Sequence, residues 1–141
     1  MKKIFLSLFL LVLVGNSYSL EIQHRAYDPI PGGAYVSFRV AGYGLSTPLD
    51  SVTIEFNLLS GGKIQSTETC EVGPITGDDF QAREIGGNVV EHCGFETVRY
   101  IDAVEIAKVT CSRDGKEFEL PLSEIVIRRF EPLPVAIKKL K

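Results

Sequence analysis

The sequence lacks the residue patterns on which common enzyme sites depend. It has two histidines, His24 and His92, and neither lies in a recognisable nucleophile or metal motif. On a strand, His92 and Cys93 would point to opposite faces and could not form a catalytic dyad. No serine lies in a nucleophile elbow, and no glycine run forms a phosphate cradle. These absences argue against an enzyme, and no cofactor is expected.

Long apolar runs are missing except at the N-terminus. A lysine pair precedes an apolar run over residues 4–14, and small residues follow at Ser17 and Ser19. This pattern predicts a secretory signal peptide over residues 1–19 and a single domain over residues 20–141. The alternative is an uncleaved membrane anchor, but this run is too short to span about 30 Å of hydrocarbon as a helix. We therefore expect an exported protein, either secreted or periplasmic.

Positive charge is in the minority. Without the lysine pair of the leader, the chain has 13 basic and 18 acidic residues, a net charge of −5. This balance argues against nucleic acid or an anionic membrane surface as the main partner. Three of the acids, Asp78, Asp79 and Glu84, lack the spacing of a calcium loop and are better explained as caps of a short helical turn. No metal site is expected.

Cysteine is also scarce. The three cysteines, Cys70, Cys93 and Cys111, are separated by 22 and 17 residues, which matches no zinc-binding spacing. An exported chain meets an oxidising compartment, so two of them are expected to pair. Three connectivities are open, and we favour Cys93–Cys111. The third cysteine would be a buried free thiol or a link to another chain.

Alternating apolar and polar residues are abundant. The clearest case is a hairpin around Asp114-Gly115, a preferred two-residue turn, whose register pairs Cys111 with Phe118 and Ala107 with Leu122. Segment 63–72 is polar and suits an edge strand. The predicted strands cover residues 21–27, 34–40, 51–59, 63–72, 88–93, 104–111, 117–122 and 124–130.

Seven or eight short strands with almost no helix indicate an all-β protein. The turn spacing favours a β-sandwich of about seven strands, with a small barrel as the alternative. Val36, Phe38 and Val40 share one face of their strand and are predicted to point into the core.

A binding surface is suggested by two tyrosines with an arginine between them. Tyr35, Arg39 and Tyr43 are predicted to be exposed, and tyrosine and arginine are enriched at protein–protein hot spots. Open strand edges give a second opportunity, because they invite pairing or strand exchange with another copy.

Several stretches resemble the interleukin receptor mimic proteins of pathogenic enterobacteria. They are the lysine-rich leader, the opening over residues 20–29, and the turn over residues 111–116. The resemblance implies an immunoglobulin/fibronectin type III-like sandwich, a strand-exchanged homodimer, and binding of host interleukins as a soluble receptor would bind them. The chain departs from the broader fibronectin type III pattern because it has no tryptophan for the core.

The sequence thus predicts a secreted, non-enzymatic β-sandwich that binds another protein. The resemblance makes this a bacterial virulence factor that engages host cytokines. One alternative is a periplasmic or surface-assembly subunit, related to adhesins or pili. The other is a small exported hydrolase, which would need a polar pocket joining a histidine to carboxylates.

Overall fold

The computed structural model describes residues 18–43, 45, 47–75, 91–97, 100–129 and 133–138. The signal peptide predicted for residues 1–19 and the capped turn with Asp78, Asp79 and Glu84 lie outside these residues, apart from Tyr18 and Ser19. The strands are β1 (Leu20–Ile30), β2 (Gly33–Gly42), β3 (Ser51–Ser60), β4 (Lys63–Val72), β5 (Glu91–Thr97), β6 (Ala103–Arg113), β7 (Lys116–Glu119), β8 (Ile125–Arg129) and β9 (Val135–Ile137), with a short 3-10 turn at Leu122–Glu124.

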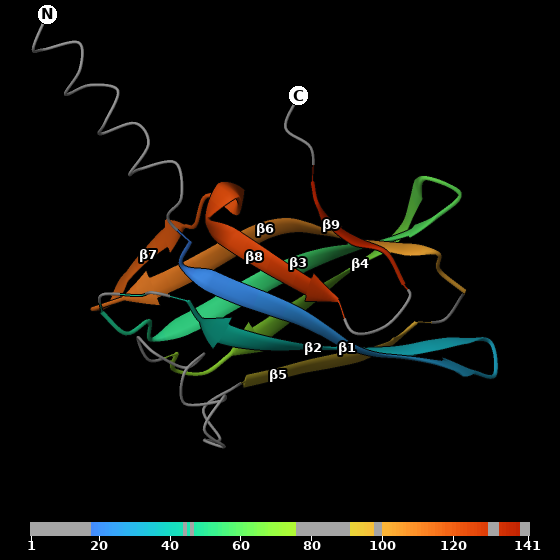
Figure 1. The fold of residues 1–141 in the computed structure, drawn as a ribbon, viewed down its shortest axis with the longest axis horizontal. Coiled ribbons are helices and arrows are strands. Elements are labelled where there is room, and N and C mark those ends of the chain that lie inside the picture. Colours follow the sequence, from blue (N-terminus) through green and yellow to red (C-terminus); the bar gives the residue numbers. More distant parts are fainter. Residues whose placement is uncertain are drawn as a thin grey trace, which may run out of the picture.

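Two sheets face each other and form a sandwich (Figure 1). One sheet has the strand order β5-β2-β1-β8, and the other has the order β4-β3-β6-β7 with β9 also paired to β6. The prediction of an all-β sandwich is confirmed. The described residues form nine strands where seven or eight were expected, because the basic segment after residue 134 adds β9 beside β6.

The core lies between the two sheets and is built by strand alternation. Every second residue of the long central strands points inward and is fully buried, as predicted for β2. At the centre, the Phe38 and Phe56 rings stack across the sandwich with centroids 4.6 Å apart, and Phe95 lies 5.6 Å from Phe56. This phenylalanine cluster gives the core large aromatic side chains in the absence of tryptophan.

The central hairpin forms with the predicted register as far as residue 119. Asp114 and Gly115 both take positive φ, and Cys111 pairs with Phe118. The predicted pairing of Ala107 with Leu122 is wrong, because the chain enters the 3-10 turn after Pro121. Proline cannot donate a ladder hydrogen bond, so β7 ends before it.

The boundaries of β5 also differ from the prediction. The predicted strand ended at residue 93, but β5 continues to Thr97 and pairs with β2 along its whole length. At the end of this pair, a side chain on Gly33 would place its Cβ 1.9 Å from the Thr97 carbonyl oxygen. Only glycine fits this close approach of the two backbones.

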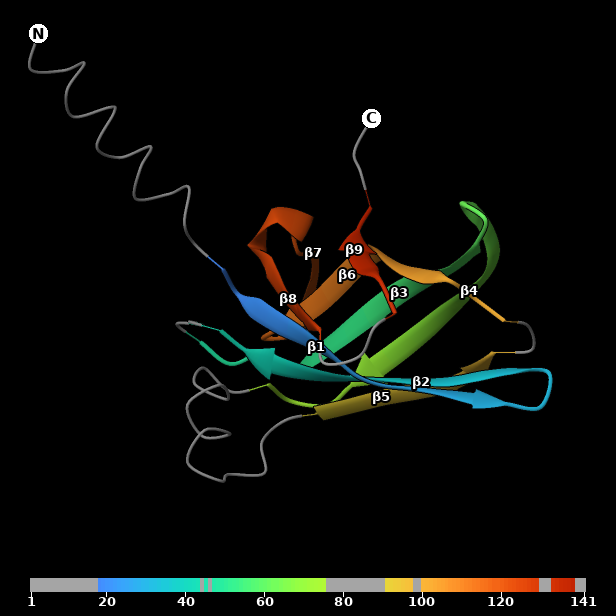
Figure 2. The ribbon, with the colours of Figure 1, turned by 45° about the vertical axis from the view of Figure 1, so that its right-hand side comes forward.

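The C-terminal strands cross between the sheets. The chain passes from β7 in one sheet to β8, which pairs in parallel with β1 in the other, and then returns to β9 beside β6. In Figures 1 and 2 these strands lie along one side of the sandwich, opposite β5. They cover one edge of each sheet, so β4 and β5 are the outer strands at the other side.

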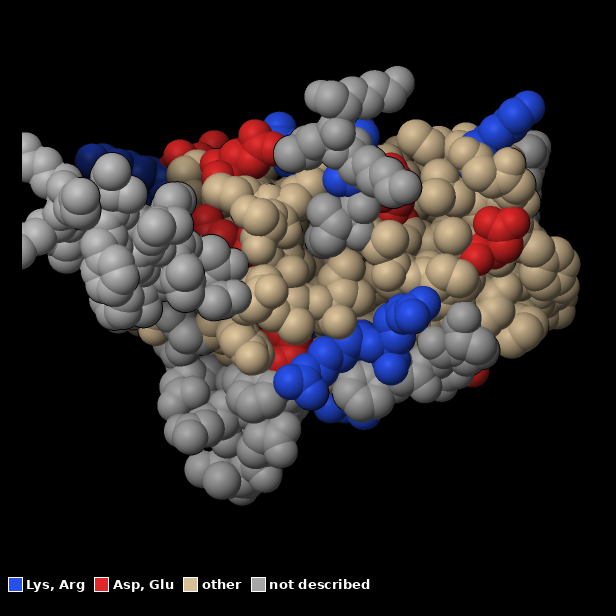
Figure 3. All heavy atoms as spheres, turned by 45° about the horizontal axis from the view of Figure 1, so that its top comes forward, with Lys and Arg blue, Asp and Glu red and all other residues tan. Residues whose placement is uncertain are grey.

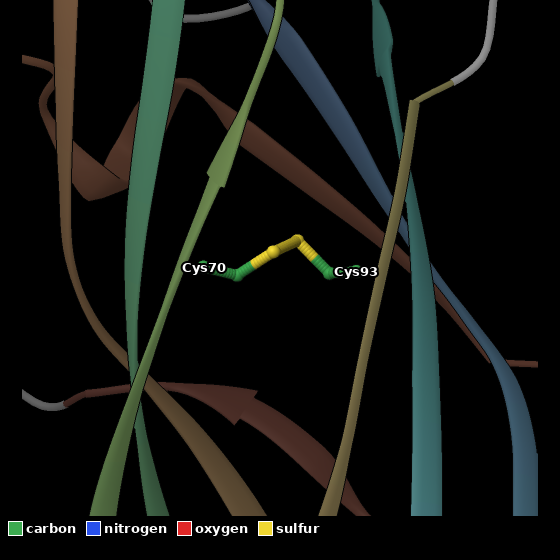
Figure 4. The surroundings of a disulfide bond; sticks show 2 residues. All are labelled: Cys70 and Cys93. Carbon is green, nitrogen blue, oxygen red and sulfur yellow. A yellow bond between two sulfur atoms is a disulfide. The ribbon is translucent and has the colours of Figure 1, made fainter.

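A disulfide joins these two outer strands. Cys70 of β4 and Cys93 of β5 are bonded, with their Cα atoms 6.0 Å apart (Figure 4). The predicted Cys93–Cys111 pairing is therefore wrong. Cys111 lies on β6, and β3 separates β6 from β4 in the sheet order, so its thiol stays within the core. The bridge links the two sheets where no shared strand does so.

Removal of this bridge should destabilise the fold. The Cys70→Ala/Cys93→Ala variant frees a loop with a sequence separation of 23, and we expect it to lower the free energy of unfolding by about 3 kcal/mol. Urea denaturation of the oxidised proteins measures the change. The control is Cys111→Ala, which removes a cysteine without opening the loop and should cost about 1 kcal/mol. Equal losses in both variants would contradict the role given to the bridge.

The free thiol of Cys111 is chemically protected. Its side chain is buried in the core, and burial raises the pKa of the thiol from 9.0 to about 11. The nearby charge of Arg113 opposes this shift, and that of Glu124 adds to it. Because thiolate is the reactive form, the folded protein should keep Cys111 inert.

Cys111 should make stability fall at high pH. The unfolded chain releases the thiol proton near pH 9, whereas the folded chain holds it until about pH 11. The contribution of the thiol to the free energy of unfolding is therefore fully present below pH 9 and is lost as the pH rises toward 11. Urea denaturation of the wild type and Cys111→Ala should show a stability difference that shrinks across this window. A constant difference would contradict the prediction.

Candidate functional site on the outer face of the four-stranded sheet

Two of the predicted binding residues belong to one face of β2, and the third lies just beyond the end of this strand. Strand alternation places Tyr35 and Arg39 on the outer face of the β5-β2-β1-β8 sheet, about 13 Å apart along β2. Tyr43 follows the end of β2, about four residues further on. Arg39 is exposed, and both tyrosines are half-buried. The structure thus spreads the three residues along the whole length of one strand.

The Tyr35 end of this face is acidic. Tyr35 pairs with Asp28 of β1 on one side and with Glu96 of β5 on the other. Both acids are exposed, and all three residues belong to the same row across the sheet.

The Tyr43 end is fixed by the residues before β1. The Tyr43 backbone N–H donates to the Ser19 carbonyl at 2.9 Å, and its ring meets Tyr18 edge-on at 6.0 Å. Ser19 also donates through its hydroxyl to the Glu124 carboxylate at 2.6 Å. Tyr18 and Ser19 were predicted to belong to the leader, and here they contact the domain.

The middle of the face contains a polar group that the sequence did not reveal. Gln23 pairs with Arg39 of β2 and with Arg128 of β8, so these three residues form a row over three strands. Next to this row, the Glu21 carboxylate accepts from Gln23 Nε2 at 2.7 Å and contacts Arg128 Nε at 3.0 Å. Glu21 and Gln23 are 0% and 1% exposed, respectively, although alternation points them away from the core.

His24 lies on the inner side of the same strand. It is completely buried, because it shares the inward-facing side of β1 with Leu20 and Ile22. Its ring lies 5.2 Å from that of Phe38, and its Nε2 is 3.0 Å from the Ala26 carbonyl oxygen. The structure therefore places this histidine in the packed core, away from any surface site.

The outer face of the other sheet is mainly acidic. Strand alternation on the other sheet puts Glu55, Glu71, Glu105 and Glu119 on its outer face, with Lys108 among them. In Figure 3, lysine and arginine side chains gather in a band on the side of β1 and β8, and most acidic side chains in view lie away from it. The basic band thus stands out on a chain with a net negative charge.

Metal-ligand groups and surface hollows can be assessed in the described part of the chain. Within it, no group of three or more histidine, cysteine, aspartate or glutamate side chains could hold a metal ion. A hollow of about 380 Å³ lies beside β6 and the 3-10 turn, and it contains one ionisable group, Glu119. In the same residues, no helix is long and apolar enough to cross a membrane.

The fold and this surface define a small two-sheet β-sandwich whose sheets are cross-linked by one disulfide. Among solved structures, the chain is similar to IrmA from Escherichia coli, with a TM-score of 0.60 and 23% sequence identity. The similarity covers 82% of this chain and 95% of that one. No protein-family model and no curated protein matches the chain. The resemblance to the interleukin receptor mimic proteins is therefore confirmed at the level of the fold.

The buried carboxylate should contribute to stability. Glu21→Ala leaves the Gln23 amide without its acceptor, and we expect it to lower the free energy of unfolding by about 1–3 kcal/mol. Urea denaturation measures the change. The control is Glu55→Ala, at the middle of the other outer face, which should stay within about 0.5 kcal/mol of the wild type. An equally small effect of Glu21→Ala would contradict its structural role.

Proposed function

We propose that this protein is an exported binding module that recognises another protein through the surface of its β-sandwich. In the specific form of the proposal, it is a bacterial virulence factor that binds host cytokines of the interleukin class as a soluble receptor would. The observation that carries the proposal is the similarity to IrmA, which extends over 95% of that chain.

The outer face of the β5-β2-β1-β8 sheet supports this proposal. It offers Tyr35 and Tyr43 at its two ends and exposed Arg39 between them. Tyrosine supplies large, rigid contact area with a polar tip, and arginine supplies directional donors, so both suit a recognition surface. We take these residues as the partner-binding set.

Export and dimer formation belong to the same proposal. The Cys70–Cys93 disulfide suits an oxidising compartment, which a leader over residues 1–19 would provide. The outer strands β4 and β5 supply edges through which two copies could exchange or pair strands. A strand-exchanged homodimer is the assembly that we propose.

The test is size-exclusion chromatography with light scattering on the oxidised mature protein, alone and with a panel of purified interleukins. We expect the mass of a dimer and co-elution with at least one interleukin. A protein that binds none of them overturns the cytokine proposal and favours a bacterial assembly partner instead. A monomer that binds an interleukin overturns only the dimer.

A further inference from the structure

We propose that Arg39 and Arg128 form an anion-binding pair that takes carboxylate groups from an acidic segment of the protein partner. In this arrangement, buried Glu21 is a positioning residue that holds Arg128 in place. The inference rests on the proposed protein-binding function and specifies the chemistry of the partner.

The register of the sheet supplies the geometry. Arg39 and Arg128 flank Gln23 in one row, so their Cα atoms are two strand spacings apart, about 10 Å. Arginine side chains are long enough for two guanidinium groups at this spacing to contact the same carboxylate. Arg39 is exposed, and the Arg128 side chain is 46% exposed, so both are open to a partner.

The buried carboxylate explains why Arg128 is suited to binding. An exposed arginine normally loses side-chain freedom when it binds, which weakens the contact. Here the Arg128 Nε contacts a Glu21 oxygen that Gln23 also holds. Part of the side-chain freedom of Arg128 is therefore already lost in the folded protein, before any partner binds.

Gln23 adds an observation of its own. Its side-chain oxygen is buried and accepts no hydrogen bond, although guanidinium donors lie on the strands at either side. Buried acceptors generally find a donor, so this oxygen needs an explanation. A carboxylate that draws Arg39 toward Arg128 would bring a donor within reach of it.

The charge pattern around the arginine row favours an acidic partner. The exposed acids of this face, Asp28 and Glu96, lie at its Tyr35 end, away from the row. The opposite face carries several glutamates around Lys108, so it would repel an acidic segment. The arginine row would attract the same segment, and such a difference orients a partner during its approach. An acidic protein segment is therefore the occupant that this surface fits.

The first test uses a probe that does not depend on any cytokine. Fluorescein-labelled hexaglutamate is titrated with the full oxidised protein at low salt, and binding is followed by anisotropy. We expect saturable binding that weakens about tenfold in Arg39→Ala and in Arg128→Ala. Arg39→Lys should recover only part of the loss, because lysine cannot bind a carboxylate through two parallel hydrogen bonds.

The matched control is Lys108→Ala, which removes one positive charge from the opposite face. It should leave hexaglutamate binding unchanged. Equal weakening by Lys108→Ala and the arginine variants would show non-specific attraction and overturn the inference. A heparin hexasaccharide that binds the same arginines more tightly than hexaglutamate would overturn the choice of an acidic protein segment.

The positioning role of Glu21 needs its own measurement. In proton–nitrogen spectra, the Arg128 Nε–H signal should be protected from exchange in the wild type and exposed in Glu21→Gln, with weaker hexaglutamate binding. An unchanged signal would contradict the positioning role. If Glu21→Gln fails to fold, the response of the wild-type Arg39 and Arg128 signals to hexaglutamate decides the inference, and signals that do not move overturn it.

The outcomes separate this inference from the proposed function. Binding of hexaglutamate without any interleukin would leave the arginine pair standing and remove the cytokine proposal. An interleukin that binds the wild type and both arginine variants equally would support the cytokine proposal and overturn the arginine pair.

Discussion

The fold depends on two sheets burying their inward-facing residues against each other. Phe38 and Phe56 stack at the centre of this interface, and Phe95 packs against them from β5. Because side chains alternate along a strand, a shift of one residue in any central pair would move this apolar set to the surface. The core thus fixes the register of β2 and β3, and through it the positions of all outward-facing residues, including the candidate binding surface.

The two sheets are connected differently at their two sides. On one side, the C-terminal strands cross between the sheets, with β8 covering β1 and β9 covering part of β6. On the other side, no strand crosses, and the Cys70–Cys93 bond holds the outer strands together. The parallel pairing of β8 with β1 and of β9 with β6 requires long crossover connections, so these contacts form between residues far apart in the chain.

The outer face of the four-stranded sheet combines an exposed and a buried polar layer. Arg39 is exposed, whereas Glu21 and Gln23 are buried although they also point outward from the sheet. A buried carboxylate is costly unless it is paired and hydrogen-bonded, and here Arg128 and Gln23 meet that requirement. The same contacts that satisfy Glu21 also restrain an arginine on the candidate surface.

The sequence by itself determined the all-β class, most strands and the inward residues, because alternation and turn residues act over short distances. The hairpin register followed from Asp114-Gly115 for this reason. Only the tertiary structure decided which cysteines pair, since Cys70 and Cys93 meet across two sheets. It also decided the burial of Glu21, whose strand position alone predicts an exposed residue, and its ion pair with Arg128 from a strand more than 100 residues away.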